Sequence, residues 1–172
     1  MQQAALMNIG KYQGLIAEAF YSNALIEQLA NIQSLLANNQ AEPLSHGADK
    51  VFKLPLNLGN GETFITVKVF KRQALLKDWH DRKHKSKAER SYRAALYLQA
   101  HDIGTPAPIA WLEQWQGKRL LESYYLCIYE PAICWRDALS DVYYNQRDNE
   151  PLLALLQTVA PAVRAMHDAG FM

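Results

Sequence analysis

Apolar residues recur three and four positions apart from about Asn8 to Asn38, which is the spacing of an amphipathic helix. The pattern weakens near Tyr21-Ser22, so it predicts two helices or one bent helix, with Ser22 as a suitable N-cap for the second part. The apolar positions that carry it are Tyr12, Leu15, Ile16, Ala19, Phe20, Leu25, Leu29, Ile32 and Leu36. We therefore expect residues 1–40 to form a helical extension.

The period shortens to two between Glu42 and Arg72, as in strands. An Asn-Gly pair at Asn60-Gly61 is a strong signal for a hairpin, and the run from Phe64 to Phe70 is its returning strand. Alternation divides this run into Ile65, Val67 and Val69 on one face and Phe64, Thr66, Lys68 and Phe70 on the other. Lys68 thus shares a face with two phenylalanines, which is not typical of a solvent-exposed face.

The second half of the chain repeats this alternation of helices and hairpins. We expect a helix from at least Ser86 to His101, a strand–turn–strand over 109–129, and an irregular or partly helical segment over 131–148. Pro151 suits the first turn of a last helix, and Gly170 suits its end. Sequential hairpins around one crossing helix predict an α+β fold and not a parallel βαβ fold.

Composition restricts the function without defining it. The 172 residues suit one domain or one domain and part of another, and a net charge of +1 gives no overall attraction to nucleic acid or membrane. The chain has no basic, apolar leader at its start and no stretch of about 18 apolar residues, so we expect a cytoplasmic protein.

The chain nevertheless contains one local cluster of basic residues. It comprises Lys71, Arg72, Lys77, Arg82, Lys83, Lys85, Lys87, Arg90 and Arg93. The cluster is either a site for an anionic partner, such as a phosphorylated glycolipid or a membrane surface, or a solvated helix face. Stacking aromatics are not interleaved with these cations, so we do not expect a single-stranded nucleic acid as partner.

Three residues are candidates for chemistry. Lys68, in the middle of an apolar strand, either points its ammonium group to solvent or binds an anion. Glu89 is either its ion-pair partner or part of a capping box with Ser86, Ser-x-x-Glu. Gly47 would allow a phosphate to approach the backbone, or it is an ordinary turn residue.

The order of these parts resembles the small lobe of a protein-kinase-like fold, and more closely the bacterial lipopolysaccharide kinases of the Kdo/heptose kinase and InaA type. The resemblance covers about Leu44 to Met172. It is carried by Val67-Lys68-Val69-Phe70-Lys71-Arg72, Ala88-Glu89 with Ala95-Leu96-Tyr97-Leu98, Ile103-Gly104-Thr105-Pro106-Ala107-Pro108, and Met166-His167-Asp168-Ala169-Gly170-Phe171. It implies a kinase-like N-lobe over 41–130, with one αC-type helix, and a hinge and first part of a C-lobe over 131–172.

This resemblance also implies an activity. The family transfers the γ-phosphate of ATP, with Mg²⁺, to a sugar hydroxyl of the lipopolysaccharide core, so the protein is expected to act at the inner membrane as a peripheral protein. By motif position, Lys68 would hold phosphates, Glu89 would orient Lys68, Gly47 would lie near the phosphates, and the backbone of Ile128, Tyr129 and Glu130 would receive adenine. The catalytic loop and the metal ligands are expected after Met172, so no catalytic or metal residue is assigned and this chain alone is expected to be inactive.

Two other functions stay open. One is a kinase-like binding or regulatory module without catalysis, and the other is a phosphotransferase for small alcohols of the aminoglycoside or choline type. The apolar stripe of the last helix predicts self-association or a protein partner, which favours the binding or regulatory module. The stripe consists of Leu152, Leu155, Leu156, Val159, Val163 and Met166.

Overall fold

The computed structural model describes residues 6–38, 40–45, 49–59, 61–71, 85–133, 135–145 and 150–171. The chain divides into two compact units. The first comprises Met1–Leu96 and Pro106–Tyr129, and the second comprises Tyr97–Thr105 and Glu130–Met172. Each unit is described separately below.

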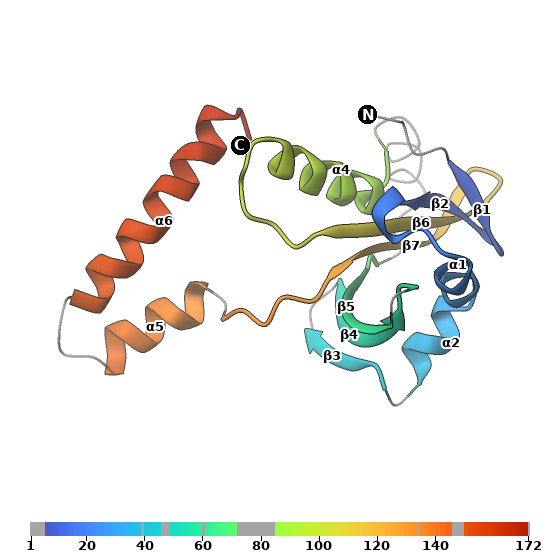
Figure 1. Ribbon diagram of the computed structural model, residues 1–172, viewed down its shortest axis with the longest axis horizontal. Coiled ribbons are helices and arrows are strands. Elements are labelled where there is room, and N and C mark those ends of the chain that lie inside the picture. The colour runs from blue at the N-terminus through green and yellow to red at the C-terminus, as the bar shows by residue number, and fades with distance from the viewer. Residues whose placement is uncertain are drawn as a thin grey trace. The chain divides into compact units, whose positions relative to one another are not determined.

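In its described residues, the first unit contains one antiparallel sheet of seven strands in the order β1-β2-β6-β7-β5-β4-β3 (Figure 1). The strands are β1 (Met7–Ile9), β2 (Tyr12–Ile16), β3 (Glu42–Ser45), β4 (Lys50–Asn57), β5 (Glu62–Val69), β6 (Pro108–Gln116) and β7 (Arg119–Ile128). Its helices are α1 (Asn23–Ala30), α2 (Ile32–Ala37) and most of α4 (Lys87–Ala100), with a 3-10 turn at Glu18–Phe20. This arrangement confirms the predicted α+β class.

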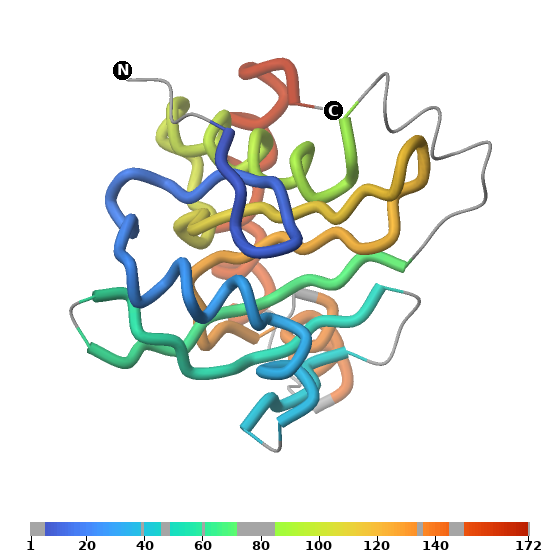
Figure 2. The backbone as a smooth tube through the Cα atoms, turned by 90° about the vertical axis from the view of Figure 1, so that its right-hand side faces the viewer, coloured from blue at the N-terminus to red at the C-terminus, as the bar shows by residue number. Residues whose placement is uncertain are grey.

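The helix predicted before Tyr21 is wrong, because the chain there forms the β1–β2 hairpin, which lies beside β6 in Figure 2. A two-residue turn of Gly10 and Lys11 joins Ile9 to its partner Tyr12. Gly10 has φ 59, which suits the first central position of a type II′ hairpin turn. In β2, Tyr12, Gly14 and Ile16 are buried at every second position, so the strand period holds.

The second half of the N-terminal prediction is confirmed. Ser22 caps α1, and its hydroxyl oxygen accepts a hydrogen bond from the Leu25 N–H at 3.2 Å. Gln28 of α1 then fastens the helix to the end of β4. Its amide donates to the Asn57 carbonyl at 3.0 Å and accepts from the Asn57 N–H at 3.0 Å.

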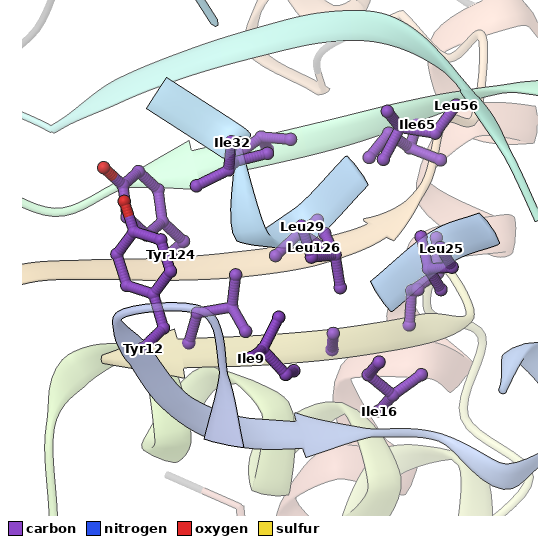
Figure 3. Packing of buried hydrophobic residues seen from close by; sticks show 14 of the residues in the cluster. Ile9, Tyr12, Ile16, Leu25, Leu29, Ile32, Leu56, Ile65, Tyr124 and Leu126 are labelled. Carbon is purple, nitrogen blue, oxygen red and sulfur yellow. The ribbon is translucent and has the colours of Figure 1, made fainter. Parts of the chain in front are cut away.

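The main hydrophobic core lies between α1, α2 and one face of the sheet. Figure 3 shows Leu25, Leu29 and Ile32 of the helices directed at side chains of the strands. The strand residues of this core are Ile9, Tyr12, Ile16, Leu54, Leu56, Ile65, Val67, Ile109, Ala110, Leu112, Tyr124 and Leu126. The predicted face of Ile65 and Val67 is therefore confirmed as a core face.

A carboxylate at the rim of this core connects three elements. Glu122 of β7 accepts hydrogen bonds from Tyr12 and Tyr124 at 2.8 Å each, and from Gln33 of α2. Lys11 lies 3.7 Å from the same carboxylate. Because the partners come from β2, α2 and β7, Glu122 holds the N-terminal hairpin and the helix against the sheet.

A second, smaller core lies on the opposite face, under α4. It contains Phe70, Ala88, Tyr92 and Trp111, with Leu15, Ala17 and Tyr125 packed against it. The predicted helix from Ser86 onward is confirmed from Lys87. It ends at Ala100, one residue before the predicted His101. Asp102 (φ 56) takes the left-handed conformation there, and the Ile103 N–H bonds to the Leu98 carbonyl.

The second unit contains α5 (Trp135–Asn145) and α6 (Glu150–Asp168). The predicted stop of the last helix is confirmed, because Gly170 has φ 72 and the Phe171 N–H bonds to the Met166 carbonyl in a Schellman motif. No side chain of α6 is buried, although its apolar stripe includes Leu156 and Val163. The tyrosine Tyr97 donates a hydrogen bond to the Ala169 carbonyl within this unit.

Candidate functional site

The face of the sheet that carries α4, here called the α4 face, is only partly covered by that helix. One row of paired residues crosses it from β4 to β2: Val51, Lys68, Tyr125, Trp111 and Leu15. The Trp111 and Leu15 end of this row belongs to the small core under α4. Val51 and Lys68 at the other end are only half-buried, so this is the open end of the row.

The face predicted for Lys68 is the one observed. Its ammonium group lies 5.1 Å from the centre of the Phe70 ring, a cation–π contact on the α4 face. No carboxylate in the described part of the chain lies within ion-pair distance of this group. Lys68 therefore carries a positive charge that the described residues leave unneutralised.

Two other lysines of the α4 face are neutralised. Lys87, in the first turn of α4, lies 5.9 Å from the same Phe70 ring and 3.5 Å from Asp49. Lys53 lies 3.2 Å from Glu42 and within 5 Å of two ring centres, Phe64 at 4.8 Å and Tyr129 at 4.7 Å. Lys68 is thus the residue of this face best suited to bind an added anion.

Glu89 lies on α4 and is buried, but it pairs with cations of its own segment. Its Oε1 lies 2.7 Å from Arg93 and 3.3 Å from Lys85. The Glu89 N–H donates to the Ser86 hydroxyl at 3.1 Å, so the cap half of the predicted capping box is confirmed. The ion pair with Lys68 is not formed in this structure, because the Glu89 carboxylate is held by Arg93 and Lys85.

The backbone predicted to receive adenine is partly used by the sheet. The Ile128 N–H donates to the Ala107 carbonyl at 2.9 Å, and the Tyr129 N–H donates to the Phe64 carbonyl at 3.1 Å. The Glu130 carbonyl accepts from the Ala132 N–H at 2.9 Å. The N–H groups of Ile128 and Tyr129 are therefore already used and are not free to donate to a base.

Gly47 lies outside the described residues, and so do Arg72, Lys77, Arg82 and Lys83 of the basic cluster. Asp49 follows Gly47 by two residues and accepts a hydrogen bond from the Lys71 N–H at 3.1 Å. Together with its ion pair to Lys87, this bond ties the beginning of β4 to the end of β5 and to the first turn of α4.

Sequence reasoning missed one buried acid beside this site. Glu113 of β6 is 5% exposed, and its Oε2 accepts a hydrogen bond from the Trp115 indole N–H at 2.6 Å. Burial raises the pKa of its carboxyl group. A single acid in a strand usually marks an exposed position, so the sequence carries no signal for this burial.

The comparisons with known proteins add no identity, since no family model, curated protein or solved structure matches the chain. In the described part of the chain, no helix is long and apolar enough to cross a membrane. The same residues contain no group of three or more His, Cys, Asp or Glu side chains that could hold a metal ion.

Proposed function

We propose that the chain binds ATP on the α4 face of its sheet, as the kinase-like N-lobe of a phosphotransferase that resembles the lipopolysaccharide kinases. The observation that carries the proposal is the position of Lys68. It lies on the third strand of a sequential meander, β3-β4-β5, and α4, the next helix in the described part of the chain, packs on the same face with a buried glutamate, Glu89. Protein kinases likewise carry their phosphate-binding lysine on a third strand and its partner glutamate on a helix after that strand.

The chemistry of the face fits a nucleotide. Two ammonium groups, those of Lys68 and Lys87, approach the Phe70 ring, and one of them has no carboxylate partner among the described residues. The segment Ile65-Thr66-Val67-Lys68 also corresponds to the kinase pattern Val-Ala-Ile-Lys, with a short side chain two residues before the lysine. A flat base could lie on such a position, while the phosphates reach the ammonium groups.

Within this proposal, Lys68 holds the α- and β-phosphates. ATP with Mg²⁺ would supply the γ-phosphoryl group for a sugar hydroxyl of the lipopolysaccharide core. Glu89 would have to leave Arg93 and Lys85 to pair with Lys68 in the nucleotide complex. The described residues offer ligands for the phosphates and none that we assign to the metal.

The first test is titration of the purified chain with ATP by isothermal calorimetry, in the wild type and in Lys68→Ala. Loss of a charge-assisted contact of about 1.5–3 kcal/mol should weaken binding roughly 10- to 100-fold. Lys118→Ala is the matched control, because it removes the same charge from the exposed turn between β6 and β7. Equal affinities in the wild type and Lys68→Ala would refute the assigned role.

A second candidate is a kinase-like module that docks to another protein and does not transfer phosphate. The observation that favours it is α6, a 19-residue helix with an apolar stripe and no buried side chain. The same calorimetric titration separates the two candidates, since a docking module without nucleotide chemistry would not bind ATP at millimolar concentration.

A further inference from the structure

Two ammonium groups approach one buried ring near the beginning of α4. Phe70 follows β5 and is 8% exposed, and the ammonium groups of Lys68 and Lys87 lie 5.1 and 5.9 Å from the centre of its ring. Lys68 comes from β5 and Lys87 from the first turn of α4, so this ring brings together cations of two different elements. Two positive charges around one ring favour a ligand that carries more than one negative charge.

The carboxylate of Asp49 is the internal partner of one of these cations. Its Oδ2 lies 3.5 Å from Lys87 Nζ, and its Oδ1 accepts a hydrogen bond from the Lys71 N–H at 3.1 Å. Ammonium groups and backbone N–H groups donate to phosphate oxygens as they do to carboxylate oxygens. Asp49 therefore occupies, with an anion of the chain itself, donors that would equally suit a phosphate.

The ion pair between Asp49 and Lys87 is weak enough to be exchanged. The side chains of Lys87 and Asp49 are 38% and 26% exposed, and ion pairs that reach solvent contribute little to stability. The hydrogen bond from the Lys71 N–H does not involve Lys87, so Asp49 can keep it while the ammonium group changes partner. An incoming phosphate would thus gain a cation at little cost to the stability of the fold.

We propose that Lys68 and Lys87 form one site for the oligophosphate group of a ligand, and that Asp49 is the internal anion that this ligand displaces from Lys87. Lys68 binds first, because it has no carboxylate partner among the described residues. Lys87 is the second cation of the site and becomes available on exchange. The inference rests on the proposed function in taking ATP as the source of the oligophosphate. Inorganic tripolyphosphate carries the same group without a base and tests the site by itself.

The test is calorimetric titration of the purified chain with sodium tripolyphosphate and with ATP, at low ionic strength so that the charges are little screened. Asp49→Asn keeps an oxygen for the Lys71 N–H and removes the competing charge, so it should tighten tripolyphosphate binding roughly 3- to 10-fold. Lys87→Met should weaken binding roughly 10-fold. The matched controls are Glu62→Gln, at the exposed start of β5, and Lys118→Met, in the exposed turn between β6 and β7, and both should bind as the wild type does.

A double variant that combines Asp49→Asn with Lys87→Met distinguishes exchange from simple repulsion. If Asp49 competes for Lys87, its replacement gains affinity only while Lys87 is present. An equal gain in both backgrounds would overturn the proposal, as would a tripolyphosphate affinity unchanged in Lys87→Met, or no tripolyphosphate binding by the wild type and Asp49→Asn. Tripolyphosphate binding with the expected pattern, but without ATP binding, would refute the proposed function and leave this inference standing. ATP binding that depends on Lys68 and not on Lys87 would do the reverse.

Discussion

The three lysines of the α4 face carry the same charge but differ in the partners that neutralise it. Lys53 is bound by Glu42 and two aromatic rings, and Lys87 is bound by Asp49. The Lys68 ammonium group lies over the Phe70 ring and has no carboxylate partner among the described residues. An ammonium group without a carboxylate partner can bind an added phosphate without first breaking an ion pair, which distinguishes Lys68 from its neighbours.

Gly14 shows how closely two strands approach one another. A Cβ atom at this position of β2 would overlap the Trp111 carbonyl oxygen on β6, which is backbone and cannot rotate away. We expect Gly14→Ala to lower the free energy of unfolding by about 2–4 kcal/mol, as overpacking of a core does. Urea denaturation measures this change.

Gly104→Ala is the matched control, because nothing lies within 4 Å of the added Cβ and no unusual φ is required. This variant should be neutral or slightly stabilising, since alanine restricts the unfolded chain. Equal stability of both variants would contradict the strand packing described for Gly14.

Buried tyrosines should make the protein sensitive to alkaline pH. Burial raises the pKa of Tyr12, Tyr92, Tyr124 and Tyr125, and the Glu122 carboxylate adds to this effect at Tyr12 and Tyr124. In the unfolded chain tyrosine loses its proton at about pH 10. Above that pH the unfolded state binds fewer protons than the folded state, so stability falls as pH rises.

The expected slope is about 1.4 kcal/mol per pH unit for each such tyrosine between its unfolded and folded pKa. Urea denaturation at pH 8, 9, 10 and 11 measures it. Tyr125→Phe should reduce the slope, and Tyr143→Phe serves as its control because that ring is exposed. A stability that is constant up to pH 11 would contradict the burial of these hydroxyl groups.

At the scale of elements, the turns and helix ends that glycine residues mark were predictable from the sequence. Gly61 of the Asn-Gly pair, Gly117 and Gly170 all have a positive φ, and the structure has a strand turn or a helix end at each of them. The β1–β2 hairpin was missed because Tyr12, Leu15 and Ile16 fit a helical spacing as well as a strand. The Gly10-Lys11 pair between two apolar residues was the available signal for the hairpin.

The candidate site was predictable to a smaller extent. Alternation along β5 was enough to place Lys68 on the face that α4 covers in part. The partners of Glu89 were not predictable, because Arg93 and Lys85 compete with Lys68 and only distances decide which cation wins. The burial of Glu113 was not predictable either, because a lone acid in a strand usually lies at an exposed position.

The end of α4 supports a prediction about a helix terminus. Asp102 takes a left-handed conformation (φ 56) that glycine adopts without strain. We expect Asp102→Gly to raise the free energy of unfolding by about 0.5–1 kcal/mol, whereas Asp102→Ala lowers it, and urea denaturation compares the two variants. A loss of stability in Asp102→Gly would mean that the aspartate side chain contributes more than the backbone strain costs.

In the first unit as a whole, the main stabilising core and the proposed ATP site lie on opposite faces of one sheet. The main core joins one face to α1 and α2, and the other face carries α4, the small core and the open end of the Lys68 row. A substitution of a half-buried side chain at that open end removes little packing. We therefore expect Lys68→Ala to change binding and to leave the free energy of unfolding within about 0.5 kcal/mol of the wild type.

The measurement that tests this account most directly is chemical-shift mapping of the ¹⁵N-labelled chain during titration with ATP. The account predicts shifts concentrated on β5 and β7 around Thr66, Lys68 and Tyr125, and their loss in Lys68→Ala. Shifts confined to the α1 and α2 side of the sheet, or none at millimolar ATP, would contradict it.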